Sequence, residues 1–207
     1  MWVLDPFAGT GSTLVACDMT RRNGIGIELS DKWANIAANR TKQYLIHGDC
    51  RNLLKYNLPP IDFCISSPPY WDMLGHSRGG SSSTQKQRIK AGFEAKFSED
   101  PFDMGNIPLY DDFMKDLMQL YKEILQITNP GKYCAVIIQN QLKENQTFFP
   151  LAWEFAFKMR DIGWQMCQEF IWCARDRKLN IWGYPSSYIS NVHHHYILVF
   201  RKPVQKS

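Results

Sequence analysis

The chain has 207 residues, enough for one α/β domain with a sizeable core and too few for a second domain of ordinary size. Hydrophobic residues make up 44% and charged residues 21%, a composition that excludes a disordered chain, and no apolar run reaches the about 18 residues of a membrane span. The net charge of +4 is uneven, because residues 76–96 hold five basic and one acidic side chain. We therefore expect a compact cytoplasmic protein with one local basic segment.

The first half of the chain alternates between predicted strands and helices. Short apolar runs predict strands at residues 2–4, 25–28, 44–46 and 61–65. A helix is expected from Ser12 or Thr13 to Met19, and a second begins at Ser30 and Asp31 and continues through residue 37. This alternation favours a parallel sheet with helices on both faces.

Residues 72–108 interrupt this alternation with an irregular, glycine- and serine-rich insertion. A helix then begins at Tyr110 and should end by residues 129–131. The remaining predicted elements are a strand at 133–138, a helix at 150–162 and strands at 165–173 and 195–201. We see no repeat and no domain boundary, so residues 1–207 are expected to form a single domain, with the insertion as a candidate ligand-contacting region.

Three acidic residues, Asp5, Glu28 and Asp49, follow the first three predicted strands. The carboxyl edge of an open α/β sheet is where ligands bind. Gly9 and Gly11 allow the backbone to approach a ligand closely, although an ordinary tight turn would also explain them. No Gly-Lys-Ser/Thr follows this turn, which disfavours a phosphate-binding loop. A nucleoside without phosphates fits better, with Glu28 accepting hydrogen bonds from ribose hydroxyls.

Two motifs carry a resemblance to a known family. Residues 5–12, DPFAGTGS, and residues 67–70, SPPY, resemble the cofactor loop and catalytic motif of S-adenosylmethionine-dependent DNA amino-methyltransferases, which make N4-methylcytosine or N6-methyladenine. The resemblance implies a Rossmann-like seven-stranded methyltransferase sheet, mostly parallel with an antiparallel last strand and helices on both faces. The cofactor-binding residues it implies are Asp5, Pro6, Phe7, Ala8, Gly9, Thr10, Gly11, Glu28, Asp49 and Cys50.

The resemblance implies that Ser67, Pro68, Pro69 and Tyr70 are catalytic. An exocyclic amine is a weak nucleophile, because its lone pair is delocalised into the ring. The Ser67 hydroxyl and the Pro68 carbonyl would accept hydrogen bonds from it, and Tyr70 would stack on a base that has left the duplex. Serine at the first position favours N4 of cytosine over N6 of adenine. Methylation at carbon 5 is disfavoured, because it needs a cysteine nucleophile in a Pro-Cys pair and the chain has no such pair.

Basic residues of the insertion are candidate DNA contacts. We expect Arg78, Lys86, Arg88 and Lys90 to contact phosphates beside the flipped base. The three histidines 193–195 are expected at the rim of the active site, and aromatic residues near the turn at 183–185 are further candidates to contact DNA. We predict no metal site, since successive side chains on a strand alternate between faces, and the six cysteines form no Cys-x-x-Cys pair and are expected to be free thiols.

The chain departs from the family pattern in two ways. No helix precedes the first strand, and there is no room for a target-recognition domain of usual size. The missing wall of the cofactor pocket would then come from a homodimer, a separate subunit or a missing N-terminal segment, or cofactor binding would be weak. Target recognition would come from residues 72–108 and 174–192 or from a separate subunit, and whether a restriction enzyme is paired with the chain is left open. The alternatives are an RNA or protein-glutamine N-methyltransferase, and an inactive DNA-binding subunit that needs a partner.

Overall fold

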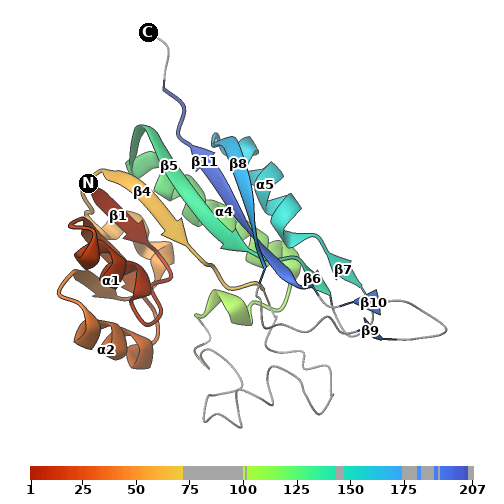
Figure 1. Cartoon of the computed structure of the whole chain (residues 1–207), viewed down its shortest axis with the longest axis horizontal. Coiled ribbons are helices and arrows are strands. Elements are labelled where there is room, and N and C mark those ends of the chain that lie inside the picture. Colours follow the sequence, from red (N-terminus) through yellow and green to blue (C-terminus); the bar gives the residue numbers. More distant parts are fainter. Residues whose placement is uncertain are drawn as a thin grey trace.

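The fold is described from a computed structural model. The structure describes residues 1–71, 100, 102–142, 147–173, 181–182, 189–190 and 192–204, with side chains for all of these except 181–182 and 189–190. Figure 1 shows the arrangement of the helices and strands.

A seven-stranded sheet forms the centre of the molecule. All seven predicted strands belong to it, and β11 is antiparallel to both of its neighbours while the strands from β3 to β5 pair in parallel, which confirms the predicted fold class. In spatial order the strands are β3 (Tyr44–His47), β2 (Asn23–Glu28), β1 (Trp2–Asp5), β4 (Ile61–Ser66), β5 (Thr128–Ile138), β11 (His194–Arg201) and β8 (Gln165–Cys173).

The sheet has two faces. Two helices cover the first face over β1, β2 and β3. Helix α1 (Ser12–Met19) packs on β2, where a Cβ atom added to Gly24 or Gly26 would lie 2.9 Å from the Leu14 side chain. Helix α2 (Asp31–Arg40) follows and contacts β2 and β3. Ser30 occupies the predicted N-cap position of α2, but its side chain makes no capping hydrogen bond.

The opposite face holds the main core. It is covered by the 3₁₀ helix η1 (Cys50–Tyr56), α4 (Tyr110–Ile127) and α5 (Leu151–Asp161). The Tyr121 hydroxyl of α4 lies 2.6 Å from the Ser66 hydroxyl of β4, and the Phe155 ring of α5 packs edge-on against Phe200 of β11. The helix predictions for α1, α2, α4 and α5 are confirmed within a few residues, whereas η1 was not predicted.

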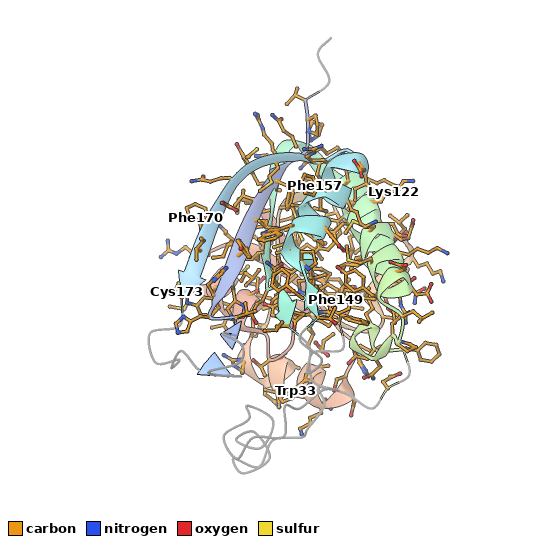
Figure 2. All side chains as sticks on the ribbon, turned by 90° about the vertical axis from the view of Figure 1, so that its right-hand side faces the viewer. Trp33, Lys122, Phe149, Phe157, Phe170 and Cys173 are labelled. Carbon is orange, nitrogen blue, oxygen red and sulfur yellow. The ribbon has the colours of Figure 1, made fainter. Side chains whose placement is uncertain are left out.

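Over β5, β11 and β8, no helix of the described residues covers the first face of the sheet. The register places Ile197 of β11 beside Ile137 of β5 and Phe170 of β8, on the face away from α5. Phe170 is 50% exposed, Trp172 is 53% exposed and Tyr133 is 41% exposed. Figure 2 views this edge of the molecule, with Phe170 on β8 and Phe157 on α5. Within the described ranges, no helix packs over these apolar side chains.

The junction between α4 and β5 differs from the prediction. We expected a turn at 129–131 and a strand from residue 133, but β5 begins at Thr128, directly after α4. Asn129 Nδ2 donates to Asp62 Oδ1 at 3.1 Å, which holds this first part of the strand beside β4. Gly131 adopts a positive φ of 76° inside the strand and its N–H donates to the Lys202 carbonyl, so the turn residues are absorbed into an irregular strand start.

Smaller elements complete the described structure. They are the 3₁₀ helix η2 (Met104–Asn106), which lies within the predicted insertion, and two short pairs, β6 (Gln141–Leu142) with β7 (Phe148–Phe149) and β9 (Ile181–Trp182) with β10 (Ile189–Ser190). All six cysteines are free thiols, as predicted. Among the described helices, none has the length and hydropathy needed to cross a bilayer.

Candidate active site

The loop after β1 is tied to helix α1 through Asp5. Asp5 is 6% exposed, and its carboxylate accepts hydrogen bonds from Thr13 Oγ1 at 2.5 Å and from the Phe7 N–H at 3.1 Å. Burial raises the pKa of Asp5 to about 6, and the hydrogen bonds from Thr13 and Phe7 oppose that rise. These two hydrogen bonds to Asp5 therefore hold the loop after β1 against the first turn of α1.

Glu28 connects this loop to the end of β2. Its Oε2 accepts from the Gly9 N–H and its Oε1 accepts from the Ser30 N–H, both at 2.8 Å. Burial raises the pKa of Glu28, and these two hydrogen bonds oppose the rise. Each carboxylate oxygen has a second lone pair, so Glu28 keeps acceptor capacity for ribose hydroxyls.

Gly9 and Gly11 have different reasons for being glycine. Both have a positive φ, of 52° and 78° respectively. A Cβ atom on Gly11 would lie 2.9 Å from Ala37 Cβ, so Gly11 is needed for close packing against α2. A Cβ atom on Gly9 would meet no described atom within 4 Å, so the loop is open to a ligand beside Glu28.

Asp49 is paired with a residue that the sequence analysis did not single out. Arg51 Nη2 donates to Asp49 Oδ2 at 2.7 Å, and the Arg51 N–H donates to Asp49 Oδ1 at 2.9 Å. The same guanidinium contacts Asp116 of α4 at 3.2 Å and the Phe102 carbonyl at 2.7 Å. The hydrogen bonds to the Asp49 carboxylate, followed by the charge of Asp49 and the contact with Asp116, raise the pKa of Arg51. Arg51 therefore holds Asp49, α4 and the segment before η2 together.

The Ser-Pro-Pro-Tyr segment follows β4 at the same sheet edge. Ser67 is exposed, whereas Pro68 and Tyr70 are buried. Ser67 Oγ and Tyr70 Oη are 3.2 Å apart, and burial raises the pKa of Tyr70. The exposed Ser67 hydroxyl is therefore supported by its neighbours Pro68 and Tyr70, which are buried.

Trp71 anchors the end of this segment. It has a positive φ of 53°, an unusual conformation for a bulky residue. Its ring is 8% exposed and packs against Tyr110 at 5.1 Å and Phe149 at 4.9 Å between centroids, and its Nε1 donates to the Ile107 carbonyl at 3.0 Å. Two separate segments, residues 107–110 and the strand β7, therefore fix the position of the residue that follows Tyr70.

Two histidines begin β11. His194 faces away from the Ser-Pro-Pro-Tyr segment, whereas His195 contacts it. His195 Nδ1 lies 3.2 Å from Tyr70 Oη, and the His195 ring is 5.3 Å from the Trp172 ring. His195 therefore lies beside the predicted catalytic segment. In the part of the chain with described side chains, no group of three metal-ligating residues comes together.

The structure brings the predicted cofactor loop, Glu28, Asp49 and the Ser-Pro-Pro-Tyr segment to one edge of the sheet, because β1, β2, β3 and β4 are parallel. The predicted DNA-contacting residues Arg78, Lys86, Arg88 and Lys90, and the turn at 183–185, lie outside the described residues. Asp103, at the start of η2, was missed: it contributes to the raised pKa of Glu28, and burial raises its own pKa. No sequence motif marks Asp103, since it lies beyond the insertion's basic segment.

Comparison with known proteins supports the resemblance over the first motif. Residues 1–39 match the family model described as DNA methylase. The type II methyltransferase M.MthZI of Methanothermobacter thermautotrophicus is 43% identical over 44 residues, which cover 21% of this chain and 12% of that protein. Both matches support the resemblance to the DNA amino-methyltransferases in the segment that holds the loop after β1.

Solved structures share the fold over a longer part of the chain. A SAM-dependent methyltransferase from Methanosarcina mazei has a TM-score of 0.57 at 9% identity and covers 99% of this chain and 93% of its own. An rRNA methylase from Streptococcus thermophilus has a TM-score of 0.53 at 10% identity, covering 98% and 87%. A candidate DNA modification methylase from Thermus thermophilus, complexed with S-adenosyl-L-methionine, has a TM-score of 0.51 at 20% identity, covering 77% of this chain and 55% of its own. The chain therefore has the methyltransferase fold, and it spans about half the length of the Thermus protein.

Proposed function

We propose that this chain is a DNA methyltransferase that transfers a methyl group from S-adenosylmethionine to the exocyclic amine of a flipped base, with N4 of cytosine favoured over N6 of adenine. The observation that carries the proposal is the exposed Ser67 hydroxyl, supported by buried Pro68 and Tyr70, at the sheet edge that also holds Glu28 and the loop after β1. The match of residues 1–39 to the DNA methylase model supports DNA as the substrate.

The residues of the sheet edge fit the proposed cofactor. The open side of Gly9 leaves room beside the Glu28 carboxylate, which would accept hydrogen bonds from the ribose hydroxyls. Asp49 would accept from the adenine amine in place of one branch of the Arg51 Nε hydrogen bond, which is shared between Oδ1 at 3.1 Å and Oδ2 at 3.0 Å. Cys50, which is 6% exposed, lies beside this position. When bound, S-adenosylmethionine supplies an electrophilic methyl group.

Ser67 and Pro68 would prepare the target amine. Hydrogen-bond acceptors on the amine protons draw the nitrogen toward tetrahedral geometry and free its lone pair for attack. The Ser67 hydroxyl oxygen is one acceptor and the Pro68 carbonyl is the second. Proline fixes φ, so Pro68 and Pro69 hold these acceptors rigidly. Positioning of this kind supplies roughly 7–11 kcal/mol of a reaction barrier.

Tyr70 would hold the base outside the duplex. Extrusion of a base costs a few kcal/mol, which contacts in the pocket offset. The Tyr70 ring is 9% exposed and lies between Ser67 and His195, so one side of it would form the wall of the base pocket. Arg78, Lys86, Arg88 and Lys90 would contact the flanking phosphates, and a homodimer or a separate subunit would supply target recognition.

The decisive experiment has two steps. Calorimetry with S-adenosylmethionine tests cofactor binding, and transfer of labelled methyl groups is then measured on unmethylated duplex DNA, RNA and a glutamine-containing protein substrate. We expect binding and transfer to DNA alone, with sequencing of the product locating N4-methylcytosine. Transfer to RNA or protein only would establish the alternative enzyme class. Absence of binding at millimolar cofactor would overturn the proposal in favour of an inactive DNA-binding subunit.

Two adjacent serines provide a matched pair of variants. Ser67→Ala removes the proposed amine acceptor and should lower transfer by about 10²-fold without changing cofactor binding. Ser66→Ala removes a hydroxyl that faces Tyr121 on the other sheet face, so it should lower stability and leave the transfer rate of the folded protein unchanged. Equal transfer rates in the two variants would remove Ser67 from its proposed role.

A further inference from the structure

A chain of three polar side chains joins two distant parts of the sequence. Ser67 Oγ lies 3.2 Å from Tyr70 Oη, and Tyr70 Oη lies 3.2 Å from His195 Nδ1. Tyr70 and His195 are 125 residues apart in sequence, and their ring centroids are 5.7 Å apart. The proposed reaction uses Ser67 and Tyr70 but gives no role to His195.

We propose that His195 is a positioning residue, which sets the direction of the hydrogen bonds along this chain so that Ser67 presents a lone pair to the target amine. This inference rests on the proposed function and deepens it. His195 would not touch the substrate; it would act through the Tyr70 hydroxyl.

The direction of the hydrogen bonds depends on the tautomer of His195. We assign the neutral imidazole with its proton on Nε2, so that Nδ1 is an acceptor only. Tyr70 then donates its proton to His195 Nδ1 and accepts from the Ser67 hydroxyl. Because Ser67 has used its one proton, only lone pairs remain on its exposed side, and an amine N–H is the group that they accept.

The opposite direction would oppose the reaction. If Nδ1 carried the proton, His195 would donate to the Tyr70 oxygen and Tyr70 would donate to Ser67. The Ser67 proton would then point outward, toward the amine protons. The acceptor state of His195 is therefore the one that suits an incoming amine.

Burial and packing keep this chain in place. Tyr70 is 9% exposed, while Ser67 is exposed, so the chain is sheltered at one end and open at the other. The Trp172 ring lies 5.3 Å from the His195 ring with 33° between their planes, which restricts rotation of the imidazole. The contact with Trp172 therefore limits the orientations in which the His195 imidazole can face the Tyr70 hydroxyl.

The test uses the full chain and variants at two positions. His195→Leu removes the acceptor, and His195→Asn keeps an acceptor near the place of Nδ1. We expect His195→Leu to lower kcat about tenfold with little change in KM for DNA, and His195→Asn to recover most of that loss. In a Tyr70→Phe background, which lacks the intervening hydroxyl, His195→Leu should lower kcat by less than about twofold further.

A neighbouring histidine is the control. His194 points to the opposite sheet face, where its ring contacts Tyr196 at 4.8 Å, so His194→Leu should leave kcat unchanged. Equal losses in His195→Leu and His195→Asn, or an undiminished loss in the Tyr70→Phe background, would overturn the inference.

Unfolding in urea keeps this test separate from that of the proposed function. If the wild-type chain methylates nothing, the proposed function fails, and the same variants still measure the contact. The fall in the folding equilibrium constant for Tyr70→Phe with His195→Leu should then be smaller than the product of the two single falls, by about fivefold. Simple multiplication of the two effects would refute the contact itself.

Discussion

The two halves of the sheet are built in different ways. Around β1, β2 and β3, helices or 3₁₀ turns cover both faces, and the contacts of the loop after β1 join residues fewer than 20 positions apart, such as Asp5 with Thr13 and Glu28 with Gly9. Around β5, β11 and β8, the described helices cover one face only, and the contacts join residues far apart, such as Tyr70 with His195. The loop of the proposed cofactor site therefore depends mainly on local structure, whereas the support of the proposed catalytic segment depends on the completed sheet.

The largest expected effect is in the half with one covered face. Phe155 is fully buried between Tyr121 and Phe200, and it is the central ring with which α5 covers β11. Phe155→Ala should lower the free energy of unfolding by about 3–5 kcal/mol, as measured in urea. Trp153→Ala on the exposed side of α5, where the ring is 50% exposed, should cost less than about 1 kcal/mol. Similar losses of unfolding free energy in the two variants would mean that the packing of α5 on this face does not stabilise the fold.

The next effect concerns the half covered on both faces. Burial raises the pKa of Asp5 from 3.8 to about 6, so the folded state binds this proton more tightly than the unfolded state. The stability that Asp5 contributes is therefore fully present below about pH 4 and is lost as the pH rises through 6. The difference in unfolding free energy between wild type and Asp5→Asn should change by about 2 kcal/mol between pH 4 and pH 7. A constant difference would mean that Asp5 is solvated.

A pair of glycines in the same half gives a smaller contrast. Gly11→Ala combines a left-handed backbone with a clash against Ala37, whereas Gly9→Ala meets only the backbone cost. We expect Gly11→Ala to cost about 2 kcal/mol more than Gly9→Ala in thermal or urea unfolding. Cofactor affinity should fall more in Gly9→Ala than in Gly11→Ala, because the added methyl group at Gly9 would occupy the open side of the loop. If both variants lost the same stability, Gly11 would not pack closely on α2.

The smallest effect tests the uncovered face directly. Phe170 is 50% exposed on that face, whereas Leu198 of the neighbouring strand is 2% exposed on the other face. Phe170→Ser should change the unfolding free energy by less than about 1 kcal/mol, and Leu198→Ser should lower it by several times that amount. A large loss for Phe170→Ser would show that the face is covered in solution, and the comparison between the two halves would no longer hold.

The sequence predicted the strands, the main helices and the sheet edge where the site lies, because each depends on local hydrophobic patterns and turn residues. Glu28 and the glycines of the loop were predictable for the same reason. The partners of these residues were not predictable: Arg51 reaches Asp116 and His195 reaches Tyr70 only after α4 and β11 have packed. The early start of β5 was also missed, since Asn129 and Gly131 form turns in most contexts and are held in the strand here by Asp62 and Lys202.

The left-handed conformation of Trp71 has a consequence for sequence variation. A left-handed backbone costs about 1–2 kcal/mol for a residue with a Cβ atom, and the contacts of the indole with Tyr110, Phe149 and the Ile107 carbonyl offset that cost. Glycine would adopt the conformation freely but would bring no ring, and a small side chain would incur the cost without the contacts. Position 71 therefore tolerates few replacements, although it lies outside the four-residue motif that it holds in place.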